Sequence, residues 1–191
     1  MNIGASNHAK SKRQENDYYA TDPSAVEMLL NLEDIYSHVW EPACGGGHIS
    51  KTLEAHGYDV LSTDKYDYGY GKSGINFFDF DKSGFGQFDY DIVTNPPYRY
   101  AAEFIAQALN LVKNGRKVIM LLKLQFLEGK KRRELFKQYP PKRIWVSSSR
   151  ILCAKDGDFE TAIANGGSSM AYAWFVWEKG FKGDPILKWF N

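Results

Sequence analysis

The four residues Asn95-Pro96-Pro97-Tyr98 place an amide, two rigid residues and an aromatic ring directly after the apolar stretch 91–94. That stretch favours an interior strand, which must end before the proline pair because proline cannot donate to a sheet ladder. The Asn95 side-chain oxygen and the Pro96 carbonyl can then accept both N–H bonds of an exocyclic amine, leaving its lone pair to attack an electrophile. Tyr98 offers a ring face on which a flipped base can stack, a contact of about 1–3 kcal/mol. A rigid turn without a ligand is the alternative.

A second set of candidate residues surrounds the glycine run in EPACGGG, residues 41–47. Its place between a strand and a helix is where a doubly wound fold binds a nucleotide, because glycine lets the backbone approach the ligand. Asp64 ends the next strand and can accept hydrogen bonds from ribose hydroxyls. Ser50 stands where a dinucleotide pattern has its third glycine, and Glu41 would repel a pyrophosphate. The loop therefore favours another ligand, and a tight turn with no ligand is the alternative.

The acids near this loop indicate the kind of ligand. An adenosine that carries an amino-acid amine and a sulfonium would match Glu41 for its positive charge, Asp64 for its ribose and Asp79 for its adenine amine. Asp79 is expected at the end of a third strand, INFFDF. A dehydrogenase needs a loop that tolerates a diphosphate, so Glu41 and Ser50 argue against that activity.

The elements that must position these residues alternate strands with helices. TDPSAVEMLLN has a helix start, with Thr21 or Asp22 as the cap and Pro23 at the first helical position. Residues 38–64 read as strand, glycine loop, helix and strand. INFFDF and FDYDIVTN add two strands, YAAEFIAQALNLVKNG a helix, and RKVIMLLKL a strand buried on both faces. This order predicts a doubly wound α/β sheet.

The last third of the chain departs from this alternation. KRIWVSSSR and MAYAWFVWEKG are two strands joined by the polar stretch KDGDFETAIANGG, in which no helix is expected. They should therefore form an antiparallel hairpin at one edge of the sheet. The polar, aperiodic residues 1–17 are expected to form a mobile arm, and residues 18–191 a single domain.

Composition bounds the remaining choices. The 191 residues are 43% hydrophobic and 25% charged, which suits one well-packed domain, and the formal net charge of +1 makes neither nucleic acid nor membrane an obligatory partner. Cys44 and Cys153 have no His or Cys companions at ligand spacing, so we expect no disulfide and no metal site, and a cytoplasmic location. We find neither a membrane-span length of apolar residues nor a signal-peptide core.

In order along the chain, EPACGGG, STD, NFFDF and NPPY resemble the motifs of class I S-adenosylmethionine-dependent methyltransferases that modify planar amino groups. DYYATDP, LLKLQFLEGKKR and AWFVWEKG extend the resemblance to the short N6-adenine DNA methyltransferases of phages and prophages. This resemblance implies a mostly parallel, seven-stranded Rossmann-like sheet with an antiparallel last strand. It also implies S-adenosylmethionine as the cofactor and the N6 amine of adenine in DNA as the methyl acceptor.

The resemblance further implies roles for individual residues. Tyr19, Thr21 and Pro23 would close over the methionine end of the cofactor, and Phe80 would pack on its adenine. The catalytic residues would be Asn95, Pro96, Pro97 and Tyr98. The cofactor-binding residues would be Tyr19, Thr21, Pro23, Glu41, Pro42, Ala43, Gly45, Asp64, Asp79, Phe80 and Asn95. No separate general base is required, because the methylated ammonium is acidic.

DNA as the substrate depends on one basic segment. From Lys123 to Arg143 there are eight Lys or Arg residues against two Glu, with Phe126, Phe136 and Tyr139 between them, so the segment can hold a phosphate backbone. A solvated basic helix face is the alternative. The same clamp occurs in enzymes that methylate RNA bases or protein glutamine, so RNA remains a second nucleic-acid partner. Glutamine methyltransferases generally carry a preceding helical domain, whereas only about 40 residues precede Glu41.

Many adenine DNA methyltransferases also carry a separate target-recognition domain, for which this chain has no room after ILKWFN. Target readout would then come from residues 153–169, the basic segment or the N-terminal arm. A catalytically silent S-adenosylmethionine-binding module is a further alternative, against which the intact clamp and Asp64 argue. We expect a monomer without a membrane partner.

Overall fold

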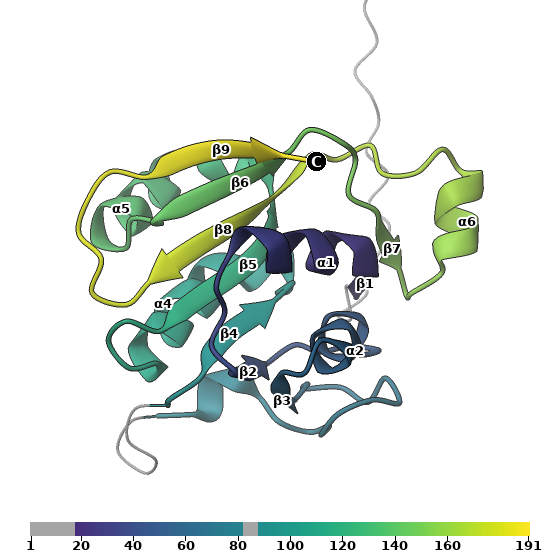
Figure 1. Ribbon diagram of the computed structural model, residues 1–191, viewed down its shortest axis with the longest axis horizontal. Helices are drawn as coiled ribbons and strands as arrows, with labels where there is room; N and C mark the ends of the chain where they lie inside the picture. The colour runs from purple at the N-terminus through teal and green to yellow at the C-terminus, as the bar shows by residue number, and fades with distance from the viewer. Residues whose placement is uncertain (1–17, 82–87) are drawn as a thin grey trace, which may run out of the picture.

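Two sheets organise the residues that the computed structural model describes, 18–81 and 88–191 (Figure 1). The strands are β1 (Tyr19–Thr21), β2 (His38–Glu41), β3 (Asp59–Ser62), β4 (Asp91–Thr94), β5 (Lys117–Lys123), β6 (Arg143–Ser147), β7 (Cys153–Lys155), β8 (Tyr172–Glu178) and β9 (Ile186–Phe190). The helices are α1 (Pro23–Leu32), α2 (His48–Ala55), α4 (Ala101–Leu111), α5 (Lys130–Gln138) and α6 (Phe159–Ala164). Three single turns of 3-10 helix are η1 (Phe77–Asp79), η2 (Tyr98–Tyr100) and η3 (Leu124–Leu127). The arm expected over residues 1–17 lies outside the described residues.

The larger sheet confirms the predicted architecture. Its seven strands have the order β3-β2-β4-β5-β8-β6-β9. β2 pairs in parallel with β3 and β4, β4 with β5, and β6 with β9, whereas β8 is antiparallel to both β5 and β6. The carboxyl ends of the parallel strands β2 to β5 therefore share one edge, and this is the edge at which open α/β sheets bind ligands.

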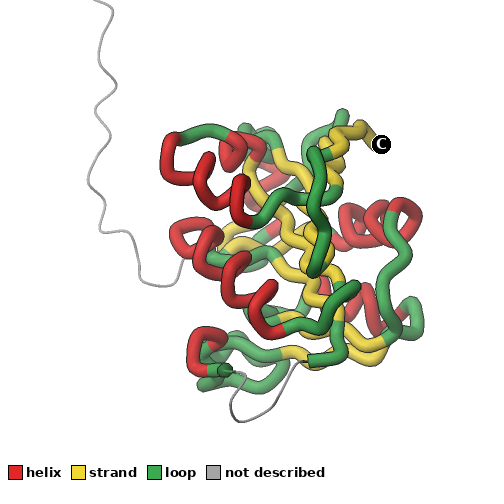
Figure 2. The backbone as a smooth tube through the Cα atoms, turned by 90° about the vertical axis from the view of Figure 1, so that its left-hand side faces the viewer, coloured by secondary structure: helices red, strands yellow, loops and turns green. Residues whose placement is uncertain are grey.

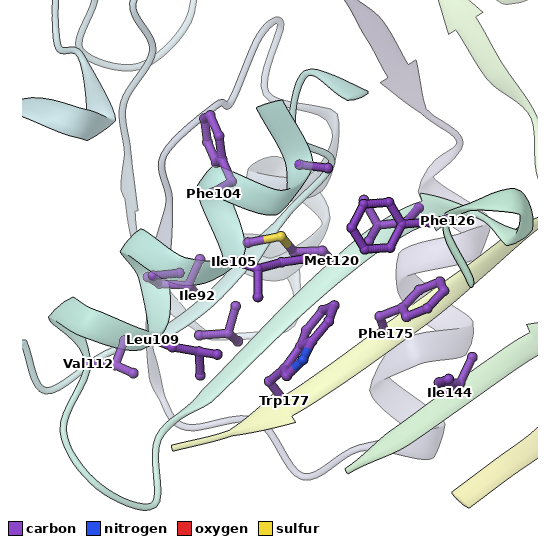
Figure 3. Packing of buried hydrophobic residues seen from close by; sticks show 14 of the residues in the cluster. Ile92, Phe104, Ile105, Leu109, Val112, Met120, Phe126, Ile144, Phe175 and Trp177 are labelled. Atoms are coloured by element: carbon purple, nitrogen blue, oxygen red, sulfur yellow. The ribbon is translucent and has the colours of Figure 1, made fainter. Parts of the chain in front are cut away.

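Helices cover both faces of this sheet (Figure 2). Val118 and Met120 of β5 belong to the core that α4 and α5 cover, whereas Ile119 and Leu121 belong to the core that α1 and α2 cover. Burial on both faces explains the continuous apolar run of β5. Figure 3 shows the first of these cores, where Ile105 of α4 packs beside Met120.

One predicted strand is wrong. INFFDF forms no strand; its middle is the turn η1, which Asn76 caps by accepting a hydrogen bond from the Phe78 amide at 3.3 Å. The rings of Phe77 and Phe80 both pack on Trp40, with centroids 5.2 and 4.8 Å from it. Side chains three residues apart share a side in a 3-10 turn, whereas they would point to opposite faces of a strand.

The reversed strand is β8, which lies within the predicted segment MAYAWFVWEKG and is antiparallel to β5 and β6. One more strand, β9, follows it and runs parallel to β6 at the sheet edge. The expected hairpin of two late strands exists as the antiparallel pair β6–β8, but β8 inserts between β5 and β6, so the pair is not the edge. Trp174 and Trp177 of β8 are buried, one in each of the two cores.

The connection between β6 and β8 contains more secondary structure than its sequence predicts. The stretch expected to have no helix contains α6, which Asp158 caps by accepting from the Thr161 amide at 3.0 Å. The connection also contains β7, which begins before that stretch and pairs antiparallel with β1 in the small sheet, with Thr21 opposite Cys153. The N-terminal end of α1 matches the prediction, since Asp22 accepts from the Ser24 amide at 2.9 Å and Pro23 opens the helix. Among the described helices, none combines the length and apolar character needed to cross a bilayer.

Candidate active site

The glycine loop and the Asn-Pro-Pro-Tyr segment meet at a cavity of about 330 Å³ by the carboxyl ends of β2 and β4. The predicted site residues that line it are Tyr19, Pro42, Ala43, Asp64, Asn95, Pro96, Pro97 and Tyr98. A smaller cavity of about 20 Å³ shares Tyr19, Ala43 and Asn95 with it and adds Thr21 and Glu41. Predicted residues from four places in the chain therefore converge on one edge of the sheet.

The Asn95 side chain is held by strand β1. Its Nδ2 donates to the Tyr19 carbonyl at 3.0 Å and to Thr21 Oγ1 at 3.1 Å. Both amide hydrogens are thereby used, so the Asn95 side-chain oxygen remains as an acceptor for a ligand. Within residues 18–81 and 88–191, no hydrogen bond ends on the Pro96 carbonyl. The two acceptors that an amine clamp requires are both present beside the cavity.

Tyr98 lines the cavity, and its ring also makes a cation–π contact with Lys123. Lys123 Nζ lies 4.4 Å from the centroid of the Tyr98 ring, and the Tyr172 ring centroid is 6.1 Å away. Burial raises the pKa of the Tyr98 hydroxyl, which keeps it protonated. A base that stacks on this ring must use the face away from Lys123 or displace the ammonium group.

Tyrosine rings cover the glycine loop. Gly45 and Gly47 have φ values of +51° and +80°, and a Cβ atom would come within 2.1 Å of the Tyr18 ring at Gly45 and within 2.2 Å of the Tyr70 ring at Gly47. The Tyr18 hydroxyl accepts a hydrogen bond from the Gly46 amide at 2.9 Å. Glycine is needed here because both the backbone conformation and the adjacent rings exclude a side chain. The group that approaches the loop closely is thus Tyr18, a residue outside the predicted set.

Glu41 is a buried acid without a cation. It is 2% exposed, and its Oε2 accepts from the Ser50 amide at 2.9 Å and from the Ser50 hydroxyl. No ion pair of the described residues includes it. Burial raises the pKa of Glu41 well above its usual range, and the charges of Asp64 and Glu54 add to the rise. Burial and the charges of Glu41 and Asp64 likewise raise the pKa of Cys44 to about 12.

Asp64 lies two residues beyond β3 and lines the larger cavity. Its Oδ2 accepts from the Gly45 amide and its Oδ1 from the Tyr66 amide, both at 2.9 Å. Burial raises the pKa of Asp64, and these backbone hydrogen bonds oppose the rise. Each carboxylate oxygen has a second acceptor site, so Asp64 can still bind a ligand hydroxyl.

Four predicted cofactor residues line neither cavity. Pro23 is exposed at the start of α1, and Gly45 lies under the Tyr18 ring. Asp79 Oδ1 accepts from Asn76 Nδ2 at 2.8 Å, and Phe80 packs on Trp40. The displacement of Asp79 and Phe80 follows from the replacement of the expected third strand by η1.

Sequence reasoning also missed much of the cavity wall. The further lining residues are Tyr18, Lys65, Tyr66, Tyr68, Ile75, Asn76, Phe77, Phe78, Arg99, Tyr100 and Phe104. YDYGYG, which begins two residues after Asp64, carried a usable signal, because tyrosine is often partly buried and three of these six residues are tyrosine. Phe104 carried none, since its place on α4 reads as an ordinary core position.

The basic segment is divided by the fold. Phe126, Phe136 and Tyr139 pack in or against the core rather than standing between exposed cations. Arg143 is bonded to Glu33, and Lys142 Nζ lies 2.6 Å from Glu178. The cations left exposed on α5 without an acidic partner among the described residues are Lys130, Lys131 and Arg133.

A larger hollow of about 1020 Å³ lies elsewhere. Its wall comes from the ends of α4 and α5 and from the turn that joins β8 to β9, around Tyr139, Gly180 and Phe181. None of the predicted site residues lines it. Size alone therefore does not identify the site, and the convergence of clamp, glycine loop and acids favours the 330 Å³ cavity.

Solved structures resemble this chain, although no family model matches its sequence and no curated protein matches it significantly. A protein from Listeria monocytogenes, assigned as a class I S-adenosylmethionine-dependent methyltransferase, aligns with a TM-score of 0.52 and 14% identity over 87% of this chain and 62% of its own. A modification subunit assigned to a type I restriction enzyme of Vibrio vulnificus YJ016 aligns with a TM-score of 0.62 and 10% identity over 93% of this chain and 48% of its own. The chain has the class I methyltransferase fold.

A third similar structure differs in its assigned substrate. A protein from Pyrococcus horikoshii, assigned as an RNA methyltransferase, aligns with a TM-score of 0.57 and 14% identity over 83% of this chain and 82% of its own. At such identities the likeness is one of fold. This chain spans less than two thirds of the length of the Listeria and Vibrio proteins, at 62% and 48%.

Proposed function

We propose that this protein transfers a methyl group from S-adenosylmethionine to the N6 amine of adenine in DNA. The observation that carries the proposal is the hydrogen bonding of Asn95. Because β1 takes both amide hydrogens, the side-chain oxygen is left as an acceptor next to the Pro96 carbonyl, at the wall of the cavity. This pair of acceptors matches the two N–H bonds of a planar amine.

The residues around the cavity fit the proposed cofactor. Glu41, a buried carboxylate with no cation partner among the described residues, suits the positively charged amine of the methionine part. Asp64 suits the ribose hydroxyls, and the wall formed by residues 75–78 suits the adenine ring. Asp79 and Phe80 are left out of this assignment, because η1 turns them away from the cavity.

The chain would act mainly by positioning. S-adenosylmethionine supplies an electrophilic methyl group on a sulfonium that becomes neutral as the methyl leaves. Asn95 and Pro96 accept the amine hydrogens and so direct the nitrogen lone pair toward that methyl, which raises the rate through alignment. Tyr98 holds the plane of the base. The proton lost from the methylated nitrogen passes to water, so no side-chain base is assigned.

The nucleic-acid substrate has separate support. Lys65, Arg99 and Lys123 are cations at or beside the cavity, where a phosphate backbone would lie next to a flipped base. Proteins of similar fold are assigned to restriction-modification and to RNA methylation. DNA is the preferred substrate, on the resemblance of the motifs to N6-adenine DNA methyltransferases, and RNA is the alternative outcome of the test.

The test is transfer of labelled methyl from S-adenosylmethionine to unmethylated duplex DNA, single-stranded DNA, RNA and a protein extract in parallel, followed by nucleoside and amino-acid analysis. N6-methyladenine in DNA supports the proposal. Label in RNA or in glutamine keeps the clamp and discards the DNA substrate. Absence of label in every pool, with the cofactor still bound, contradicts methyl transfer.

Two variants test the assigned roles. Asn95→Ala is expected to abolish transfer while cofactor affinity stays within about threefold, because the clamp and not the cofactor loses its acceptor. Asp64→Ala is expected chiefly to weaken cofactor binding. Asn110→Ala, at an exposed position on α4, is the matched control and should keep the wild-type rate. Wild-type transfer by both active-site variants would show that the site is wrongly assigned.

A further inference from the structure

A second hollow lies just past the carboxyl end of β5, and none of its lining residues belongs to the cavity described above. It measures about 610 Å³ and is formed by η3 with Glu128 on one side and by Arg150 with residues 169–171 on the other. We call it the side hollow. It lies between the end of β5 and the long connection from β6 to β8.

The β5–β8 ladder leads from the clamp to the side hollow. Lys123, whose ammonium lies 4.4 Å from the Tyr98 ring centroid, pairs with Tyr172 at the end of the β5–β8 ladder. The next pair outward, Leu124 and Ala171, is joined by a hydrogen bond of 2.8 Å from amide to carbonyl, and both residues line the hollow. A DNA strand that leaves the clamp past Tyr98 and Lys123 therefore enters the side hollow first.

The lining of the side hollow suits one nucleotide of a strand. Leu124, Leu127 and Met170 supply apolar surface for a sugar or base edge. Arg150 supplies a guanidinium, the group best matched to a phosphate because it donates two parallel hydrogen bonds. Glu128 is the acidic side chain of the lining, and it does not pair with Arg150.

The charge of Arg150 distinguishes it from arginines at the other edge of the sheet. Arg116 and Arg143, near the starts of β5 and β6, are neutralised by Asp89 and Glu33. Arg150 is exposed and donates to the Ser169 carbonyl at 3.2 Å, and no acid pairs with it among the described residues. Its positive charge is therefore available to an anion.

Further cations continue from the side hollow onto α5. Arg132 Nη1 donates to the carbonyl of Gln125, a lining residue, at 2.6 Å. Lys130 and Lys131 are exposed at the start of the same helix. A DNA strand that crosses the hollow meets these cations next. The exposed cations of α5 therefore lie on the far side of the side hollow from the clamp.

We propose that the side hollow receives the nucleotide that flanks the target adenine in DNA, and that Arg150 binds its phosphate. This inference rests on the proposed function, because it takes the clamp as the place of the target base. Arg150 would position the strand and would contact no reacting atom. Its loss should therefore weaken DNA binding and leave the chemical step unchanged.

The experiment compares Arg150→Ala, Arg150→Lys and the control Lys182→Ala, an exposed lysine in the wall of the larger hollow. Each variant is assayed for methyl transfer to an unmethylated duplex and for direct binding of the same duplex by fluorescence anisotropy at several salt concentrations. Arg150→Ala should raise KM for DNA about 10-fold, keep kcat within about twofold, and reduce the slope of log affinity against log salt by about one. Arg150→Lys should restore the salt slope, and Lys182→Ala should match the wild type.

The outcomes separate the inference from the proposed function. If the wild type methylates DNA but Arg150→Ala and Lys182→Ala behave alike in KM and salt slope, the side hollow is wrongly assigned and the proposed function stands. A larger loss with Lys182→Ala than with Arg150→Ala would move the strand to the larger hollow and also overturn the inference. If the wild type methylates no DNA, the proposed function fails, and the side hollow loses its assigned ligand with it.

Discussion

Two buried glutamates, one near the starts of the parallel strands and one at their carboxyl ends, are held by different contacts. Glu33, just after α1, is 4% exposed, and Glu41, at the end of β2, is 2% exposed. Glu33 is surrounded by donors, whereas Glu41 has neighbouring acids and one serine. A buried charge is costly unless it is paired, so Glu33 is an acid that stabilises the fold, whereas Glu41 is the acid for which we propose a ligand.

The surroundings of Glu33 account for its charge. It accepts a forked pair of hydrogen bonds from Arg143, one from Trp145 Nε1 at 2.7 Å, and one from Lys117 Nζ at 3.2 Å. Burial alone would raise the pKa of Glu33, but these donors outweigh it and hold the pKa below its usual range. Since Arg143 and Lys117 begin β6 and β5, the cluster connects the end of α1 to the amino-terminal ends of these strands.

The surroundings of Glu41 leave its charge uncompensated. Burial and the nearby Asp64 and Glu54 raise its pKa, and only the Ser50 hydrogen bonds oppose the rise. Acids perturbed in this way are concentrated at functional sites. Burial alone therefore does not distinguish these two acids; what sets Glu41 apart from Glu33 is that no cation among the described residues pairs with it.

The largest expected effect is on stability, at the Glu33 end. Glu33→Gln should lower the free energy of unfolding by about 3 kcal/mol or more, because it leaves two partly buried cations without their partner. Urea unfolding followed by circular dichroism measures the change. Glu134→Gln, which breaks an exposed pair with Lys137, should cost less than about 0.5 kcal/mol. Equal losses for the two variants would remove the distinction between buried and exposed pairs.

At the carboxyl ends of the strands, Glu41→Gln should lower the affinity for the cofactor and leave the stability of the fold nearly unchanged. Glu41→Gln can still accept the Ser50 hydrogen bonds, so its free energy of unfolding should stay within about 1 kcal/mol of the wild type. Affinity for S-adenosylmethionine, measured by calorimetry, should fall about 10- to 100-fold, or about 1.4 to 2.7 kcal/mol. The control is Glu54→Gln on α2, which should keep most of the affinity. A loss of stability as large as that of Glu33→Gln would make Glu41 a structural acid.

The two acids should also give opposite dependences on pH. The folded-state pKa of Glu33 is lowered, so its stabilisation is present above its usual value of 4.5 and is lost as the pH falls through the folded-state value. The folded-state pKa of Glu41 is raised, so ionising it costs stability as the pH rises above 4.5. As the pH rises, the free energy of unfolding of Glu33→Gln should therefore fall relative to the wild type, and that of Glu41→Gln should rise relative to the wild type. Unfolding curves between pH 3.5 and 8 measure both trends, and parallel trends would refute the comparison.

The sequence predicted the parts of the site that local rules control. A proline pair ends a strand wherever it occurs, and a glycine run between strand and helix fixes a loop at the sheet edge, so Asn95 and Gly47 are located by their own segments. The mostly parallel sheet follows from the alternation of elements in the same way.

Other features depend on contacts between residues far apart in the chain, so the local sequence carries no signal for them. The turn η1 replaces a strand because Phe77 and Phe80 both pack on Trp40, far away in sequence. The orientation of the Asn95 amide comes from Tyr19 and Thr21, whose strand β1 is itself fixed by β7. Ser50 was visible only as a missing glycine, although its side chain is what bonds to Glu41.

The smallest expected effect is at Ser50, and it tests how the charge of Glu41 is tuned. The Ser50 hydroxyl donates to Glu41 and accepts from Ser62 Oγ at 2.7 Å, while the Ser50 amide donates to Glu41 independently at 2.9 Å. Ser50→Ala therefore removes one of two hydrogen bonds that favour the charged carboxylate, and the pKa of Glu41 should rise further. Cofactor affinity should fall about threefold at pH 7 and recover as the pH rises and Glu41 ionises. Ser62→Ala, which leaves both bonds to Glu41 in place, is the control. Binding curves for Ser50→Ala that overlay those of Ser62→Ala at every pH would mean that the ligand does not sense the charge of Glu41.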